Sequence, residues 1–483
     1  MSNKLFTSLE DGRQYCEDIL GKGKTFDIVI QRVHIRDLAV LIVYVSGLVN
    51  NDSVANLLTH LQHEGTAHLH EAKDENEYFY DHFNFQGMTP MEERDAFITG
   101  VLSGQVGFIT KSGYCFITEF RNYPGRNPEE PANERVIRGA RDGFAENIII
   151  NAALVRRRIR SPKLRLEMQK ISTLGETDVA ICYMEDIVNE EHLEWVKKRL
   201  EQIHHDGLTM ADKSLEEWMF KQKFHPVPFV RYSERPDIVA AHLLEGHIAI
   251  IVDTSPSVIL LPVSMFHLLM HAEEYRQAPL IGTVMRSLRY FAAIFSLFLI
   301  PLWYLLATNM ENLPEKISFI GVKEASEVPL YLQLVLVDIG IEFLRIAAIH
   351  TPTPLSTAMG LIAGIMIGDI AINVGLFSPE AILYSSIAAV FTFAIPHYEL
   401  SISVKVFRQI LLAATALFAA NGFFVMSFLI FVYLCTLRPM NIPYLWPVVP
   451  FFPNAFKRII IRFPMADEAL RPYIVGAKNR KRG

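Results

Sequence analysis

The feature that most constrains this chain is a set of long, almost uncharged runs confined to its C-terminal half. Tyr290 to Thr308 has 19 residues without a charged side chain, and Gln409 to Thr436 has 28. Ala381 to Pro396 is a third uncharged run, and Thr357 to Val374 contains a single ionisable residue, Asp369. About 20 apolar helical residues are enough to cross the hydrocarbon core of a bilayer. The C-terminal half is therefore predicted to be a helical membrane domain.

The segment from Leu330 to Ile349 differs from these runs because it is apolar but carries Asp338, Glu342 and Arg345. Their spacing of i, i+4 and i+7 places them on one face of a helix. Charge inside a bilayer is costly, so this face is predicted to meet protein or water instead of lipid. Two roles are open. The three residues are either an internally neutralised set on an interfacial helix or a vestibule or coupling element beside a pore.

The distribution of basic residues predicts which side of the membrane each end occupies. The chain from Leu437 onward has nine Lys or Arg and two acids, a net of 9 − 2 = +7, which is typical of a cytoplasmic segment and suits anionic lipid. Arg286 and Arg289 place the start of the first span on the same side. The number of crossings is then even, and four is preferred, with Leu330 to Ile349 re-entrant or interfacial. Six crossings, with the last run a hairpin, is the alternative; that run is long enough to be tilted, or broken at Asn421-Gly422.

The N-terminal region has frequent charges and short apolar runs, as a globular α/β region has. Runs rich in Val, Ile and aromatic residues between polar turns are predicted to be buried strands. The predicted elements are strands at 26–30, 38–48, 177–184 and 247–252, hairpins at 105–120 and 246–263, and a helix at 189–203.

A segment rich in Pro and Asn, Asn122 to Pro131, is a predicted break between two subdomains. The first 21 residues lack a basic segment followed by an apolar run, so no cleavable signal is expected and the N-terminal region is predicted to be cytoplasmic. The expected fold is multidomain, with two cytoplasmic α/β subdomains followed by a polytopic helical transmembrane domain. The expected boundaries are 1–125 and 126–287 for the two subdomains, 288–437 for the transmembrane domain and 438–483 for a basic cytoplasmic tail.

Composition and motifs argue against several classes of function. A net charge of −6 and a pI near 6.3 argue against bulk nucleic-acid binding. The four cysteines are far apart and are predicted to be free thiols. The sequence has no nucleotide-binding glycine motif and no nucleophile elbow, so no enzyme and no cofactor is expected. A histidine cluster lacks the H-E-x-x-H spacing and is interpreted as a solvated helix end in preference to a metal site; it comprises His60, His63, His68 and His70 with Glu64 and Glu71.

The most informative apolar run has glycines at every fourth position, Gly360, Gly364 and Gly368, followed at once by Asp369. Such a stripe lets another helix approach closely. Asp369 is an ionisable residue in an otherwise apolar span, and Asn373 lies one turn beyond it. Two interpretations are evenly balanced: a tightly packed helix pair with Asp369 near the headgroups, or a helix whose glycines, Asp369 and Asn373 line a pore.

Arg156, Arg157 and Arg158 form a basic group in the second predicted subdomain. They are candidates for binding phosphate or lipid headgroups. Pairing with carboxylates is at least as well supported, either in a neighbouring subunit or with acids such as Glu134 and Glu146.

Several motifs occur in order along nearly the whole chain: ERVIRGARDGFAEN at 134–147, NAALVRRRI at 151–159, RSLRY at 286–290, the glycine stripe and FTFAIP at 391–396. Together they resemble the A subunits of the GerA family of bacterial spore germination receptors. The resemblance implies a two-part cytoplasmic domain and a membrane domain that assembles into a ring, expected to be a pentamer. The ring would enclose a channel for monovalent cations in the spore inner membrane, with a second membrane protein of the germination machinery as partner.

The resemblance also assigns residues. It places the pore on the helix that holds the glycine stripe, and the family signature or a subunit interface on Arg138, Arg141, Glu146, Arg156, Arg157 and Arg158.

This chain departs from the nutrient-receptor pattern at two places. Asp253-Thr-Ser-Pro256 stands where many members have Asp-Gly, a small residue and Pro, and Asp369 stands where a neutral polar residue is common. The departures favour a chain that amplifies a signal begun by other receptors over one that binds a nutrient itself. A ring of Asp369 carboxylates would favour cations. A non-conducting membrane scaffold is the second hypothesis, and a secondary transporter ranks last because the apolar runs show no inverted repeat.

Overall fold

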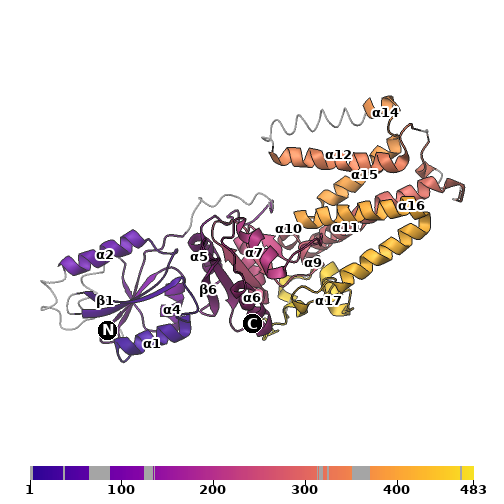
Figure 1. The fold of residues 1–483 in the computed structure, drawn as a ribbon. Helices are drawn as coiled ribbons and strands as arrows, with labels where there is room; N and C mark the ends of the chain where they lie inside the picture. Colours follow the sequence, from indigo (N-terminus) through magenta and orange to yellow (C-terminus); the bar gives the residue numbers. More distant parts are fainter. Residues whose placement is uncertain are drawn as a thin grey trace. The chain divides into compact units, whose positions relative to one another are not determined.

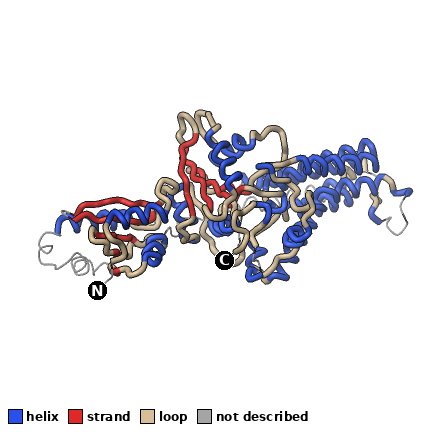
Figure 2. The backbone as a smooth tube through the Cα atoms, turned by 90° about the horizontal axis from the view of Figure 1, so that it is seen from below, coloured by secondary structure: helices blue, strands red, loops and turns tan. Residues whose placement is uncertain are grey.

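The computed structural model describes residues 4–35, 38–64, 87–123, 134, 136–312, 314, 319–323, 326–350, 370–467 and 470–482. The chain forms two compact units, and Figure 1 labels some of their elements. The first unit comprises 1–223, 230–262 and 465–483, and the second comprises 224–229 and 263–464. All the described strands, red in Figure 2, belong to the first unit. The boundaries predicted at 125, 287 and 437 stay predictions.

The first sheet of the first unit is antiparallel and has the strand order β1-β2-β4-β5-β3. Side chains of β2 alternate between two cores because successive residues of a strand point to opposite faces. Leu41 and Val43 join a core with α1 and α4, whereas Val40 and Ile42 join a core with α2. The elements are α1 (Leu9–Leu20), β1 (Ile28–Ile35), β2 (Leu38–Val45), α2 (Asn51–Glu64), β3 (Thr89–Pro90), α4 (Arg94–Leu102), β4 (Val106–Thr110) and β5 (Cys115–Thr118).

The second sheet is also antiparallel and has the order β6-β7-β9-β10-β8. Every residue of β9 and β10 is buried, as expected for central strands. Helices α5 and α8 pack against β7 and β9, and α6 packs against α7. The elements are α5 (Ile148–Arg158), β6 (Leu164–Ile171), β7 (Thr177–Met184), α6 (Glu190–Glu201), α7 (Ala211–Phe220), β8 (Arg231–Ser233), α8 (Pro236–Glu245), β9 (Ile248–Val252) and β10 (Val258–Leu261).

Several predicted elements are confirmed in this unit. The hairpins expected at 105–120 and 246–263 are β4–β5 and β9–β10. Helix α6 matches the predicted helix, and the Asn189 side chain caps its first turn by accepting from two backbone N–H groups. All four cysteines are free, as predicted. Burial raises the pKa of the Cys16 thiol to about 12, so this thiol stays protonated at neutral pH.

The second unit is helical in its described residues. Short helices lead into α11, a 30-residue helix that contains the first predicted span. The elements are α9 (Met265–Leu268), α10 (Ala272–Arg276), α11 (Pro279–Thr308), α12 (Leu330–His350), α14 (Ala371–Asn373), α15 (Pro379–Phe393), α16 (Tyr398–Thr436) and α17 (Pro453–Ile460). Single 3-10 turns lie at Met310–Asn312 and Pro439–Asn441 here, and at Met465–Asp467 and Tyr473–Val475 in the first unit.

Helix α16 is a hairpin of two helical halves. Ala419 has φ 50° and ψ −133°, which no α-helix contains. The rings of Phe407 and Tyr433 lie 6.0 Å apart, although a straight helix would separate these residues by about 39 Å. A Cβ on Gly422 would lie only 2.0 Å from the Ala414 carbonyl oxygen, so the close return requires glycine. Of the two sequence alternatives, a tilted run or one broken at Asn421-Gly422, the structure has the break, and the reversal begins two residues earlier at Ala419.

Among the described residues, α11 and α16 are long and apolar enough to cross a membrane. Helix α15 is apolar but has only 15 residues. The apolar helices fit a membrane protein.

A buried ion pair connects the two sheets of the first unit. Arg156 on α5 donates from Nε to Asp27 Oδ2 at 2.8 Å and from Nη2 to Oδ1 at 3.1 Å. Its Nη1 donates to the carbonyl oxygens of Ser161 and Leu164. The side chains of Arg156 and Asp27 are 0% and 1% exposed. The resemblance assigns Arg156 to the family signature or a subunit interface, which stays a prediction, and its guanidinium is paired within this chain.

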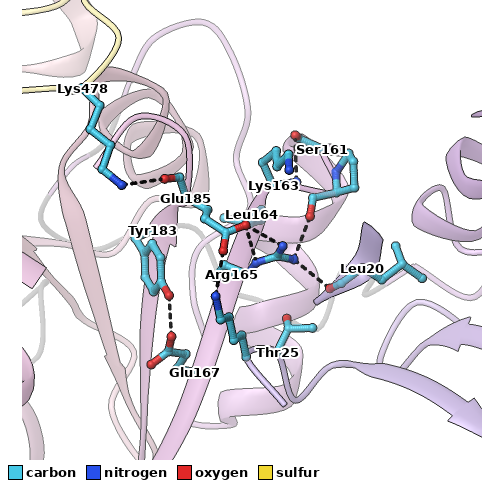
Figure 3. A network of polar contacts seen from close by, with 12 residues as sticks. Leu20, Thr25, Ser161, Lys163, Leu164, Arg165, Glu167, Tyr183, Glu185 and Lys478 are labelled. Carbon is cyan, nitrogen blue, oxygen red and sulfur yellow. Dashed lines mark hydrogen bonds and ion pairs between the residues drawn. The ribbon is translucent and has the colours of Figure 1, made fainter. Parts of the chain in front are cut away.

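Arg165 on β6 makes a second connection, shown in Figure 3. Its Nη1 donates to the Leu20 carbonyl at the end of α1 at 2.8 Å, which satisfies a terminal helix carbonyl. Its Nε donates to Glu185 at 3.1 Å. Gly21 has φ 71°, and a Cβ there would lie 2.3 Å from the Arg165 guanidinium. Glycine is thus required for α1 to end against this side chain.

We expect Asp27→Asn to destabilise the first unit, because it leaves the Arg156 charge buried without its carboxylate. Breaking a buried pair costs about 3–5 kcal/mol, so the thermal midpoint of the full chain in detergent should fall by roughly 10 °C. The double change Asp27→Leu with Arg156→Met removes both charges and should lose much less. Equal losses in the single and double variants would contradict this account.

A charged network among the helices of the second unit

One guanidinium connects four helices of the second unit. Arg408 on α16 is fully buried and pairs through Nη2 with Asp338 on α12, which is 5% exposed. Its Nη1 donates to the Ser296 carbonyl on α11 at 2.9 Å and to Thr392 Oγ1 on α15 at 3.2 Å. Gln409 donates to the second carboxylate oxygen of Asp338. The geometry uses the planar fork of arginine, which donates in several fixed directions.

A second charged cluster lies one helical turn along α12. Glu342 accepts from Lys405 on α16, whose side chain is 8% exposed. Arg345 approaches Glu342 at 3.8 Å and donates to Ser401 Oγ at 3.0 Å. The Arg345 guanidinium also lies 4.2 Å from the centre of the Tyr398 ring, which is a favourable cation–π distance.

The pairing order shows that α12 and the first half of α16 run antiparallel. Asp338 pairs with Arg408, and Glu342, which is four residues later, pairs with Lys405, which is three residues earlier. With Arg345, the network holds three cations and two carboxylates. A buried charge is stable only when it is paired and hydrogen-bonded, so these contacts fix the register of the two helices.

One half of this network is evident in the sequence. The stripe on Leu330–Ile349 is predicted to meet protein or water, and the structure shows that it meets protein, because Asp338 and Glu342 both contact α16. The alternative in which the stripe neutralises its own charges applies to the contact of Glu342 with Arg345. Asp338 and Glu342 are paired mainly with residues of α16. Lys405 and Arg408 were missed because they lie just before the long uncharged run. Lys405 and Arg408 are three residues apart, and Asp338 and Glu342 are four apart, so each pair lies on one face of its helix. This match of spacing and opposite charge could have predicted the pairing.

A separate ion cluster lies where α11 begins. The Glu274 carboxylate, fully buried on α10, pairs with Arg286 at 2.7 Å and with Arg289. Arg286 also donates to the carbonyls of Arg458 and Ile459 at the end of α17. Arg286, the first residue of the RSLRY motif, therefore contacts both the buried Glu274 on α10 and the end of α17.

The predicted pore residues are only partly within the described part of the chain. Gly360, Gly364, Gly368 and Asp369 lie outside it. Asn373 is the last residue of the short helix α14. The histidine cluster at His60, His63, His68 and His70 lies outside the residues whose side chains the structure describes. No group of three His, Cys, Asp or Glu suited to a metal ion occurs among the described residues.

The remaining signature residues occupy the surface of the first unit. Arg138, Arg141 and Glu146 are exposed. Arg158 pairs with Asp142 at 2.6 Å, and Arg157 lies over the Tyr123 ring at 4.6 Å. Carboxylate pairing of the basic group thus occurs, but the partners are Asp27 and Asp142, whereas Glu134 pairs with Arg231.

Comparison with known proteins agrees with the motif resemblance. The family model described as Bacillus/Clostridium GerA spore germination protein matches residues 14–474. The chain is 43% identical to stage V sporulation protein AF of Bacillus subtilis (strain 168) over 99% of this chain and 97% of that protein. It is 28% identical to spore germination protein KA of the same organism, over 95% of this chain and 86% of that one.

A solved structure is also similar to part of the chain. The N-terminal domain of the A subunit of the Bacillus megaterium spore germinant receptor GerK3 is covered completely by 55% of this chain, with 26% identity and a TM-score of 0.43. The match of the family model to nearly all of the sequence, together with the 43% identical relative, shows that this chain belongs to the GerA family of spore germination proteins.

Proposed function

We propose that this chain forms an oligomeric ion channel in the spore inner membrane that releases monovalent cations during germination. The ring is expected to be a pentamer and to work with a second membrane protein. The observation that carries the proposal is the buried charged network, because ionisable side chains inside a membrane domain usually serve an ion path or the element that controls it. Family membership supplies the setting in germination.

The network supports a role in coupling. Arg408 contacts α11, α12 and α15 at once, so α12 cannot shift along α16 without exchanging these partners. Helix α12 ends at His350, seven residues before the run that holds the glycine stripe. Asp338, Glu342 and Arg345 would thus transmit a movement of the surrounding helices to the pore segment.

The topology that best fits this proposal has six crossings. The two halves of α16, 398–418 and 420–436, have lengths of about 31 and 25 Å, so each is close to the thickness of the hydrocarbon core. The other four proposed crossings are α11, α12, the run at 357–374 and α15. The total number of crossings is then six, which is even and keeps both ends of the domain on the cytoplasmic side. The hairpin favours this alternative over four crossings.

The amplifier role is preferred over a nutrient-binding receptor subunit on two grounds. The relative at 43% identity is the stage V sporulation protein, whereas spore germination protein KA is 28% identical. The difference from the nutrient-receptor pattern at Asp253 to Pro256 also favours the amplifier role. A non-conducting scaffold is the second candidate, and it predicts intact rings without current. No catalytic activity is proposed.

Asp369→Asn should weaken the preference for cations, because it removes a ring of carboxylates from the pore. The measurement is the reversal potential in a KCl gradient across a planar bilayer containing the purified protein with its membrane partner. Asp467→Asn, an exposed acid in the first unit, is the matched control and should leave the potential unchanged. An unchanged potential in Asp369→Asn would remove this residue from the filter. The absence of current from an intact wild-type ring would favour the hypothesis of a non-conducting scaffold.

Lys405→Met should alter opening without altering selectivity, because it leaves Glu342 without its cation on α16. The open probability in single-channel records should change by about tenfold or more, since breaking a buried pair shifts the balance of states by several kcal/mol. Adding Glu342→Gln should restore part of the change. If open probability is unchanged in a variant of lowered thermal stability, the network only holds the fold together.

A further inference from the structure

The segment 450–461 exposes aromatic and basic side chains together. It comprises Pro450 to Phe452, then α17 and Ile461. Phe451 is 60% exposed, Phe452 is 37% and Ile461 is 36%. Lys457 and Arg458, in the last turn of α17, are also exposed. Helix α17 has eight residues, about 12 Å, and is therefore too short to cross a bilayer.

Contacts with α11 fix the depth of this segment. Tyr290 is the first residue of the uncharged 19-residue run of α11, and its hydroxyl donates to the Ile459 carbonyl at 3.2 Å. One turn earlier, Arg286 donates to the carbonyls of Arg458 and Ile459 at 3.1 and 3.2 Å. The end of α17 therefore lies at the level where α11 passes from charged to uncharged sequence.

The attachment to α11 is firm. The Arg462 backbone N–H donates to Thr283 Oγ1 at 3.1 Å, and its guanidinium donates to the carbonyls of Gln277 and Tyr275. A Cβ on Gly282 would lie 2.4 Å from the Glu274 carbonyl oxygen and 3.0 Å from Arg462 Cδ, so the close approach requires glycine. The segment is thus held on the membrane helix instead of trailing from it.

We propose that segment 450–461 binds the membrane surface and is selective for anionic phospholipid. Phe451 and Phe452 enter the boundary between headgroups and acyl chains, where aromatic side chains concentrate. Lys457 and Arg458 meet anionic headgroups, and each basic residue near such a surface contributes favourably to binding. The depth set by Tyr290 and the excess of positive charge favour a lipid surface over a second copy of the chain.

The test places a nitroxide on the full-length protein in vesicles. Cys435 is replaced by Ser, since the other three native thiols are buried, and Phe451→Cys carries the label. Leu174→Cys is the matched control, because Leu174 is an exposed apolar residue of the first unit. We expect the accessibility to oxygen, relative to a water-soluble nickel chelate, to be several-fold higher at 451 than at 174. Phe452→Cys gives a second reporter if Phe451→Cys fails to fold.

The lipid preference is tested with phosphatidylcholine vesicles with and without phosphatidylglycerol. The label at 451 should lie deeper when the anionic lipid is present, and Lys457→Gln should remove that difference. An accessibility at 451 equal to that at 174 would overturn the proposal. A low oxygen accessibility at 451 together with spin–spin broadening that disappears on dilution with unlabelled protein would overturn it in favour of a second copy. A depth independent of both lipid charge and Lys457 would overturn the anionic preference.

Discussion

The arrangement of the helices in the second unit depends on the burial of the Arg408 guanidinium. A fully buried cation is unstable unless a carboxylate lies beside it, so Asp338 and with it α12 must lie against α16. The Nη1 group of the guanidinium donates to the Ser296 carbonyl and the Thr392 hydroxyl, which brings α11 and α15 to the same place. Side-chain packing alone constrains such helices weakly, because lipid is as apolar as their surfaces. This polar group therefore acts together with the apolar core that includes Trp303, Leu334 and Leu412 in holding the four helices as neighbours.

Buried arginines join separate segments elsewhere among the described residues, and Arg156 and Arg286 are two examples. Arg156 joins Asp27 to the carbonyls of Ser161 and Leu164, and Arg286 joins Glu274 to the end of α17. In each case a buried arginine binds one carboxylate and two backbone carbonyls from a separate segment. Lysine could not replace it, because a single ammonium lacks the fixed fork of donors. These sites account for the burial of Arg156 and Arg286, two arginines of the family motifs, whereas Arg138, Arg141 and Arg157 are exposed.

Periodicity and turn residues were sufficient to predict β2, β7, both hairpins and the positions of α11, α15 and α16, because these features are local. Strands β3, β6 and β8 were not predicted. The pairing of Asp338 with Arg408 spans 70 residues, and that of Asp27 with Arg156 spans 129. Neither partner could be chosen from sequence, since several acids and bases satisfy the same chemistry. The reversal in α16 was placed two residues late because Asn421-Gly422 is the stronger breaker, whereas the structure uses Gly422 for close contact with Ala414 and turns at Ala419.

The sign of the charged network bears on how the proposed channel would work. Asp338, Glu342, Arg345, Lys405 and Arg408 together carry one excess positive charge, which repels cations instead of attracting them. A preference for cations must therefore arise elsewhere, and Asp369 is the acid that the sequence places in a neighbouring apolar run. Selectivity and coupling would then reside in different residues.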